Sequence, residues 1–387
     1  MPNVKTPLDC IFAETLYTGV SVVSNAYLAF QGQRVVGVSA SKTGKLLGRF
    51  AVVTPAFIDP HSHIGMERAG EPSRDGEAND QQDSLLPLSD ALDSVQMDDA
   101  ALRDAVEMGV LYSCVVPGSG NIIGGYSAVI RNYARDSTAA LIDRAGVKAA
   151  FGYNPMSTHS WKGKRPTTRM GSVAILRGRL DEVCQKQERY RKAKGAKKQD
   201  INFSAEENVL RDVLCGKARL RVHVHKTDDI AALLRLTDEF HLKVTVDHAM
   251  DVHRPEIFRE LKRRGIPVIY GPVDAFAYKV ELKHESWRNV RHVLSSEVEF
   301  GLMSDHPVTL ARQLFLQTRW FLRAGLSKSQ AIGLVSYRNA RVLGIHDRLG
   351  TLDKGKWASF IGWSADPFDL SSYPVAVYGE GQLLFSE

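Results

Sequence analysis

Short runs of apolar residues alternate with longer stretches of helical periodicity through the middle of the chain. The short runs predict buried strands at 51–58, 112–116, 147–153, 220–225, 242–248, 267–270 and 299–304. The longer stretches predict helices at 98–107, 228–240, 255–264 and 309–324. Strand, turn and helix repeated in this order favour a parallel sheet, and this many repeats favour a closed barrel.

The two ends of the chain show a different pattern. Residues 1–54 and 350–387 hold short β-type runs punctuated by glycine, and neither end is long enough to bury a core alone. We therefore predict an α/β fold in which a (β/α)8 TIM-like barrel at 55–349 stands beside a small composite β-sandwich formed by both chain ends. Two long segments do not fit a bare barrel, and we expect polar loops at 67–99 and 158–198.

Composition narrows the range of partners. The net charge of +6 comes largely from one basic run at 186–198, which lacks interleaved aromatic platforms and therefore favours a solvated helix or loop over a nucleic-acid groove. No stretch is apolar enough for a membrane span, and the start has no secretion signal. The four cysteines have no close paired spacing. We expect a cytoplasmic protein with a small-molecule substrate, with homo-oligomerisation left open.

Histidine or aspartate stands at the ends of several predicted strands. His61 and His63 follow the first strand, and side chains two apart in extended backbone point the same way. The strand at 220–225 carries His223 and His225 with the same spacing. His248 and Asp305 end two further strands. Active sites of such barrels lie at the carboxyl ends of the strands, and imidazole with carboxylate binds divalent metals, so these residues predict a metal site.

The same residues carry a family resemblance that spans nearly the whole chain. The segments Phe-Ile-Asp-Pro-His-Ser-His at 57–63, Arg-Val-His-Val-His at 221–225 and Ser-Asp-His-Pro at 304–307 resemble the metal-dependent amidohydrolase superfamily, in the branch near imidazolonepropionase. Asn-Ala at 339–340 and Gly-Thr-Leu-Asp-Lys-Gly-Lys at 350–356 also match. The resemblance implies metal ligands at His61, His63, His223 and Asp305, with His248 as a further ligand or a carbonyl-polarising catalytic group.

One departure from that family concerns the number of metal ions. Relatives with two ions place a carboxylated lysine or a glutamate at the end of a middle strand, where this chain reads Gly-Tyr-Asn-Pro at 152–155. Tyr153 is a poor ligand at neutral pH because the phenol pKa is near 10. Lys148 is expected at the start of that strand, the wrong end. We therefore favour one ion over two, with zinc first and iron or manganese as alternatives.

Candidates for substrate binding are weaker. His225 would be left for substrate if His223 binds the metal, and Arg169 could clamp a carboxylate or lie on the surface. Tyr153 and Asn121 complete the substrate candidates, Asn121 because Pro117–Gly120 before it could bring backbone amides near a ligand or form a simple turn. His159 and His306 are expected to be structural.

These features predict a hydrolase of a C–N bond in an amide, a cyclic amide or an N-acyl compound. A metal-activated water would attack the carbonyl, and Asp305 would act as general acid and base. A deaminase of a heterocyclic amine is an alternative that differs in the leaving group. A non-catalytic scaffold that keeps the fold is another, suggested by Tyr153.

Overall fold

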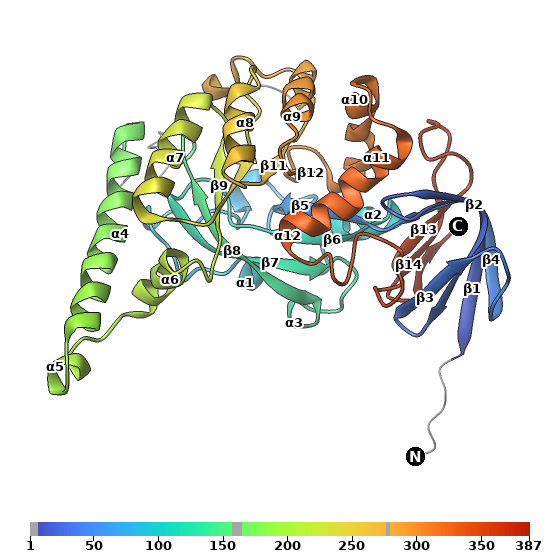
Figure 1. The fold of residues 1–387 in the computed structure, drawn as a ribbon, viewed down its shortest axis with the longest axis horizontal. Helices are drawn as coiled ribbons and strands as arrows, with labels where there is room; N and C mark the ends of the chain where they lie inside the picture. The colour runs from blue at the N-terminus through green and yellow to red at the C-terminus, as the bar shows by residue number, and fades with distance from the viewer. Residues whose placement is uncertain (1–6, 157–164, 276–278) are drawn as a thin grey trace.

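The fold was analysed in a computed structural model that describes residues 7–156, 165–275 and 279–387. A barrel sheet occupies the middle of the molecule, and a second sheet built from both chain ends lies at one end of it (Figure 1). None of the helices in the described ranges is long and apolar enough to cross a membrane. The four cysteines are free.

The barrel sheet confirms the predicted TIM-like fold. Its eight strands, in spatial order from one edge to the other, are β12 (Phe300–Leu302), β11 (Val268–Tyr270), β10 (Val244–His248), β9 (Leu220–Val224), β8 (Leu141–Ala150), β7 (Ile123–Arg131), β6 (Val110–Val115) and β5 (Phe57–Ser62). Neighbouring strands run parallel, except that β7 is antiparallel to both β6 and β8.

Strand β7 was missed in the sequence because Gly124 and Gly125 resemble a turn. Gly125 has a φ of 107°, and a Cβ atom there would lie 2.0 Å from the carbonyl oxygen of Ser89. The glycine therefore lets the loop at 84–90 pack directly on the strand. Packing of that loop, and not chain reversal, accounts for the glycine pair.

Asn339 joins the two edge strands of the barrel sheet. Its Nδ2 atom donates to the carbonyl of Ile58 on β5 at 2.6 Å and to that of Leu302 on β12 at 2.8 Å. Its Oδ1 atom accepts from the backbone N–H of Leu302 at 2.8 Å. Nearby, Asp59 accepts from the backbone N–H and the hydroxyl of Ser304. Side chains therefore close the barrel where the two edge strands meet.

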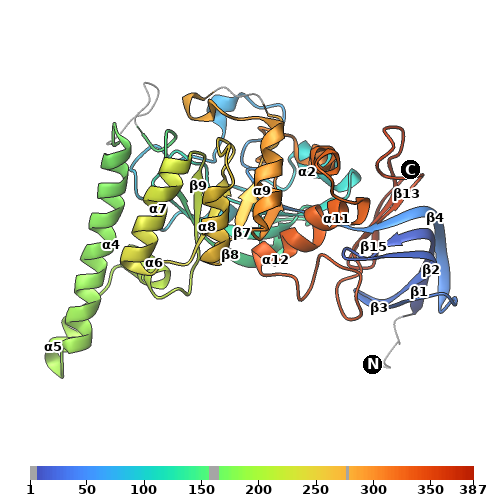
Figure 2. The same ribbon diagram turned by 45° about the horizontal axis from the view of Figure 1, so that its top comes forward.

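Helices pack around the outside of the barrel (Figures 1 and 2). The helices near the predicted bounds are α2 (Ala100–Glu107), α7 (Thr227–Phe240) and α8 (Glu256–Arg263). Short helices for which the sequence predicted no bounds are α1 (Ala91–Ser94), α3 (Ser137–Ala140), α5 (Ala196–Gln199), α6 (Ala205–Leu214), α9 (Val290–Ser296), α11 (Lys328–Gly333) and α12 (Asn339–Leu343). The helix predicted at 309–324 is broken into 3-10 turns followed by α10 (Thr318–Arg323).

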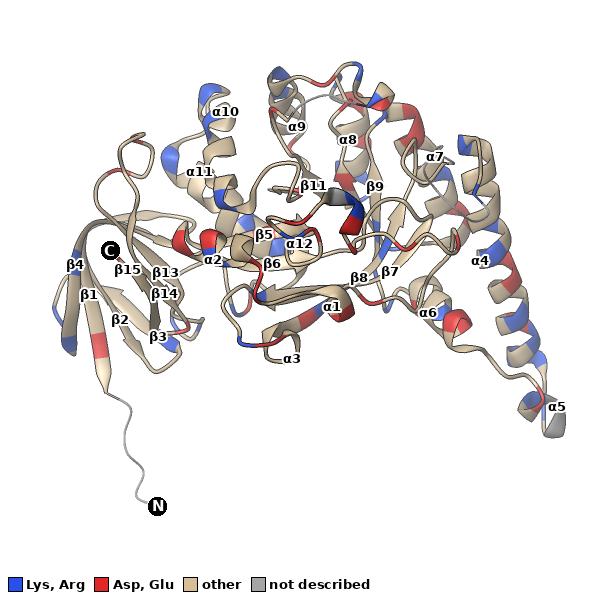
Figure 3. Cartoon of the chain, turned by 180° about the vertical axis from the view of Figure 1, so that it is seen from behind, with Lys and Arg blue, Asp and Glu red and all other residues tan. Residues whose placement is uncertain are grey.

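The prediction of a loop at 158–198 was wrong over most of that range. Residues Arg169–Lys192 form the 24-residue helix α4, whose far end projects from the body (Figure 1). Its apolar residues Leu176, Leu180 and Val183 are buried, while acidic and basic residues are mixed along its outer surface (Figure 3). The high charge density hid this narrow apolar stripe in the sequence. The basic run at 186–198 therefore spans the end of α4, a short link and α5, so helix, one of its two predicted forms, accounts for most of it.

The second sheet contains both chain ends, as predicted. Its seven strands, in spatial order, are β15 (Gln382–Ser386), β14 (Pro374–Gly379), β13 (Phe360–Trp363), β4 (Lys45–Pro55), β1 (Leu8–Tyr17), β2 (Val22–Gln31) and β3 (Arg34–Ser39). The ring of Phe30 on β2 lies 5.5 Å from that of Phe360 on β13, although two strands separate them in the sheet. The sheet therefore curls over its own core. The domain boundaries at 54/55 and 349/350 stay predictions.

Candidate metal centre

The side chains predicted to bind a metal meet at the carboxyl ends of four barrel strands. His61 and His63 come from the end of β5, and His248 is the last residue of β10. Asp305 follows β12. His223 and its neighbour His225 come from the end of β9, and all of these side chains are buried or nearly so. The structure therefore brings together the residues that the sequence pattern selected.

Asp305 lies at the centre of one group. Its Oδ1 atom is 3.5 Å from Nε2 of His61 and 3.4 Å from Nε2 of His63, and its Oδ2 atom is 4.0 Å from Nδ1 of His248. Asp305 and His248 have positive φ angles of 53° and 81°, a conformation that costs energy outside glycine and is concentrated at functional sites. One ligand atom each from His61, His248 and Asp305 lies within 4.8 Å of the others.

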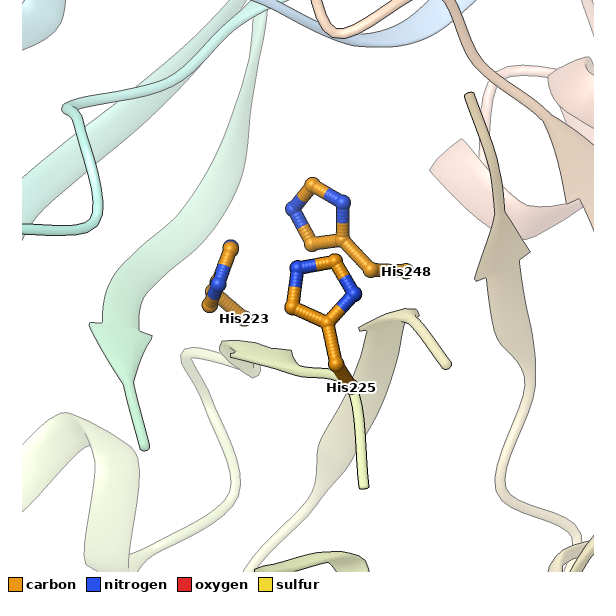
Figure 4. A group of neighbouring side chains, drawn as sticks. All are labelled: His223, His225 and His248. Carbon is orange, nitrogen blue, oxygen red and sulfur yellow. The ribbon is translucent and has the colours of Figure 1, made fainter. Parts of the chain in front are cut away.

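A second group consists of imidazoles alone. The ring centroids of His223 and His248 are 4.1 Å apart, and His225 lies 4.7 Å from His223 and 4.8 Å from His248. Figure 4 shows the three rings close together at the ends of β9 and β10. His248 thus belongs to both groups. The choice between His223 and His225 as ligand stays a prediction, since both point into the site.

Whether these residues fit a metal ion can be judged from the buried ring nitrogens that have no hydrogen-bond partner. Nε2 of His61 and of His248 and both ring nitrogens of His225 lack hydrogen-bond partners among the described residues. A buried polar atom left in this state costs about 1–3 kcal/mol, so several of them in one place are unusual unless something binds there. Imidazole nitrogens with a carboxylate are the donor set that zinc takes. The residues present fit a divalent metal ion.

The protonation states suit metal binding. Burial lowers the pKa of His61 to about 4, although Asp247 acts against the shift, and burial lowers that of His225 to about 3. Burial also holds the pKa values of His223 and His248 well below the ordinary value. Burial raises the pKa of Asp305, but the facing imidazoles outweigh it and the net shift is downward. Near neutral pH the site therefore offers neutral imidazoles and a carboxylate.

Each of three imidazoles is oriented through its Nδ1 atom. Nδ1 of His61 lies 2.7 Å from Asp247, Nδ1 of His63 lies 2.8 Å from the carbonyl oxygen of Val116, and Nδ1 of His248 lies 3.1 Å from that of Gly271. These acceptors place a proton on Nδ1 and leave the Nε2 lone pair free. Partners of this kind fix the tautomer and orientation of metal-binding histidines.

Lys148 corrects an expectation from the sequence. Strand β8 begins at Leu141, so Lys148 lies two residues before its carboxyl end at Ala150 and not at its start. The first half of β8 is only partly buried and is interrupted by the exposed pair Asp143 and Arg144, which concealed it. The fully buried Nζ atom of Lys148 donates to the carbonyl of Pro117 and to Ser119 at 2.9 Å each, and burial lowers its pKa to about 8.

Tyr153, in contrast, is 39% exposed and lies in the turn after β8. Its backbone N–H donates to a carboxylate oxygen of Glu281 at 2.8 Å. The preference for a single ion, which depended on Tyr153 standing at the bridging position, stays a prediction.

The weaker substrate candidates have other partners. Asn121 donates to the carbonyls of Asp80 and Asp83 and so holds the long loop after β5. Arg169 pairs with Asp229 at 2.9 Å and thereby connects α4 to α7. Their substrate roles stay predictions. His306 is buried and accepts from the backbone N–H of Ala311, in keeping with a structural role, whereas His159 lies outside the described residues.

Three residues near the site were missed in the sequence. Asp247 is one residue before His248, and regular strand alternation would have put the two on opposite faces. Arg221 is fully buried and donates to Asp247 at 3.2 Å and to the carbonyl of Pro60 at 2.5 Å. Glu281 comes from a polar loop that has no local signal at all. For Asp247, the adjacent His248 was the available clue.

Comparisons with known proteins show the family and the fold. The model of the family described as "Amidohydrolase family" matches residues 52–382. An amidohydrolase from Thermotoga maritima, known from its crystal structure, superposes with a TM-score of 0.90 at 28% identity, covering 98% of this chain and 100% of that one. A zinc-bound adenosine deaminase from Xanthomonas campestris shares the fold with a TM-score of 0.56 at 15% identity, over 98% of this chain and 95% of that one.

One curated relative was also found. "Amidohydrolase tasK" from Hapsidospora irregularis is 25% identical over 359 residues, which make up 87% of this chain. The match spans 36% of the length of that relative, so this chain corresponds to about a third of it.

Proposed function

Because the chain belongs to the amidohydrolase family, we propose that it is a divalent-metal-dependent hydrolase of a C–N bond in a small molecule. The bond would be that of an amide, a cyclic amide or an N-acyl compound. Family membership supports a hydrolase or deaminase reaction in general. The observation that carries the narrower proposal is the set of unpartnered imidazole nitrogens gathered around the ionised Asp305.

The proposed metal position lies among His61, His63, His248 and Asp305. Zinc is our first choice because nitrogen and carboxylate donors suit it, with iron or manganese as alternatives. A divalent ion held there would supply Lewis-acid chemistry and lower the pKa of a bound water. The neutral imidazoles would hold the ion, and their Nδ1 partners would keep the rings aimed at it.

Asp305 is the proposed proton-transfer group. Its carboxylate is ionised near neutral pH because its pKa lies below the ordinary value, so it can accept a proton from the attacking water. It then returns the proton to the leaving nitrogen, which departs as an amine. His225, whose ring nitrogens have no partners among the described residues, is the proposed donor to the substrate carbonyl as charge develops there.

Metal content and substrate turnover test the proposal together. Purified protein should retain zinc or take it up on reconstitution, and His61→Ala should lower both metal content and hydrolysis of a panel of N-acyl amino acids and cyclic amides. Release of ammonia from heterocyclic amines, without hydrolysis of that panel, would instead show a deaminase. Protein that takes up none of the three metals would contradict the proposal and leave a scaffold.

A further inference from the structure

Glu281 is a buried carboxylate that the proposed chemistry does not use. It lies in the 3-10 turn Val280–Leu282, in the segment that follows β11, and its side chain is 0% exposed. One oxygen, Oε2, accepts the backbone N–H of Tyr153 at 2.8 Å. The other oxygen, Oε1, has no hydrogen-bond partner among the described residues. Burying a carboxylate oxygen without a partner costs free energy, so a binding partner for Oε1 is expected.

The backbone after β8 is shaped around this carboxylate. Gly152 has a φ of 84°, and a Cβ atom there would lie 2.6 Å from Oε2 of Glu281 and 3.1 Å from a carboxylate oxygen of Asp229. Only glycine leaves room for Glu281 at the end of the strand. The carboxylate that two-metal relatives carry on a middle strand is therefore present at this strand end, but it comes from a different segment of the chain.

The gap between Glu281 and His223 fits a cation. Oε1 of Glu281 lies 3.9 Å from Nε2 of His223, which is too long for a hydrogen bond. The Asn154 amide donates to the same Nε2 atom at 3.3 Å, so this nitrogen presents a lone pair. Glu281 Oε1 and His223 Nε2 thus face each other across 3.9 Å with no hydrogen bond between them. Ligands bound to one ion at about 2.0–2.2 Å can be up to roughly 4.3 Å apart, and the gap falls within that limit.

We propose that Glu281 and His223 hold a second divalent cation, separate from the position at His61, His63 and Asp305. The inference rests on the proposed function in so far as both assign metal chemistry to this barrel end. The segment that carries Glu281 is anchored. His284 donates its backbone N–H to Asp251 at 2.5 Å, and Asn289 donates to the carbonyl of His284 at 2.8 Å. With two protein ligands identified, this cation would be the more weakly held of the two.

Cobalt titration of the metal-free full-length chain tests the proposal without an activity assay. Free Co²⁺ after equilibrium dialysis gives the number of bound equivalents and their affinities, and the visible absorption of Co²⁺ reports its ligands. We expect one equivalent of Co²⁺ to bind tightly and a second to bind more weakly. Glu281→Gln should weaken the second by about tenfold or more and leave the first unchanged. The glutamine carbonyl can still accept the Tyr153 N–H, so the fold is preserved, which circular dichroism checks.

Two matched variants serve as controls. Glu285→Gln removes a partly buried carboxylate from the same segment and should leave both equivalents unchanged. Lys279 acts electrostatically on Glu281, so Lys279→Met tests whether the lysine is the intended counter-charge. We expect Lys279→Met to keep the second equivalent.

The remaining outcomes separate the two proposals. A single equivalent in the unmodified chain, or a second equivalent unaffected by Glu281→Gln, would overturn the role of Glu281 while the proposed function stands. Loss of both bound Co²⁺ equivalents in Glu281→Gln would also overturn the role of Glu281, because the two cations would then not occupy separate positions. Failure of the unmodified chain to bind any metal would overturn both proposals.

Discussion

Nδ1 of His61 lies 2.7 Å from the carboxylate of Asp247, and both side chains are fully buried. Burial raises the pKa of Asp247, but Arg221 and His61 outweigh it and hold that pKa at about 2. Asp247 is therefore an ionised acceptor that keeps the Nδ1 proton of His61 in place. The adjacent residue, His248, is itself a proposed ligand, so one strand end supplies a ligand and the orienting partner of another.

Asp247→Asn should weaken the first metal equivalent by about 10- to 100-fold, because an amide cannot hold the His61 tautomer as an ionised carboxylate does. Metal affinity by competition with a coloured chelator measures the change. Asp238→Asn, at an exposed carboxylate outside the site, should leave the affinity unchanged. Equal affinity in Asp247→Asn and the unmodified chain would show that the tautomer of His61 does not depend on this carboxylate.

Asn339→Ala should destabilise the barrel by roughly 2–5 kcal/mol. The change removes three hydrogen bonds, to the carbonyls of Ile58 and Leu302 and from the N–H of Leu302, and each contributes about 0.5–1.5 kcal/mol. Urea denaturation followed by tryptophan fluorescence measures the loss. The control Asn208→Ala, at an exposed position on α6, should change stability by less than about 0.5 kcal/mol. Equal midpoints for the two variants would mean that Asn339 does not close the barrel.

The sequence predicted those parts of the fold and site that have a local pattern. His61, His63, His223 and His248 each end an apolar strand, so position along the strand was sufficient to select them. Lys148 was misplaced because the exposed pair Asp143 and Arg144 interrupts the first half of its strand. Glu281 had no pattern to select it, since its role arises only when the segment after β11 folds over the end of β8.

Tyr153→Phe should leave metal content and affinity unchanged. The phenol is partly exposed, phenol oxygens bind divalent ions poorly at neutral pH, and the backbone N–H that binds Glu281 is kept by any residue except proline. Metal analysis by mass spectrometry checks this outcome. Tyr153→Pro, which removes the N–H, is the contrasting variant and should weaken the second equivalent as Glu281→Gln does. Loss of metal in Tyr153→Phe would restore the sequence-based concern about this position.

The stability of the metal-free protein should fall more steeply with acid than that of His61→Asn. The pKa of His61 is about 4 in the folded chain and about 6.5 when unfolded, so between these values the unfolded chain binds more protons. Unfolding free energy therefore decreases as the pH is lowered through this window. From pH 7 to pH 5 the contribution of His61 is roughly 2 kcal/mol.

Comparison with the variant is needed because other groups titrate in the same range. Burial lowers the pKa of His225 to about 3, which adds to the effect, whereas burial raises that of Asp59 to about 7, which opposes it. Both contributions are present in the unmodified chain and in His61→Asn, and they largely cancel in the difference, since His61 is the weakest of the causes of the His225 shift. Urea denaturation of both proteins at pH 7 and pH 5, in the presence of a chelator, gives that difference. Equal loss of stability in the two proteins would mean that His61 is not held neutral by its surroundings.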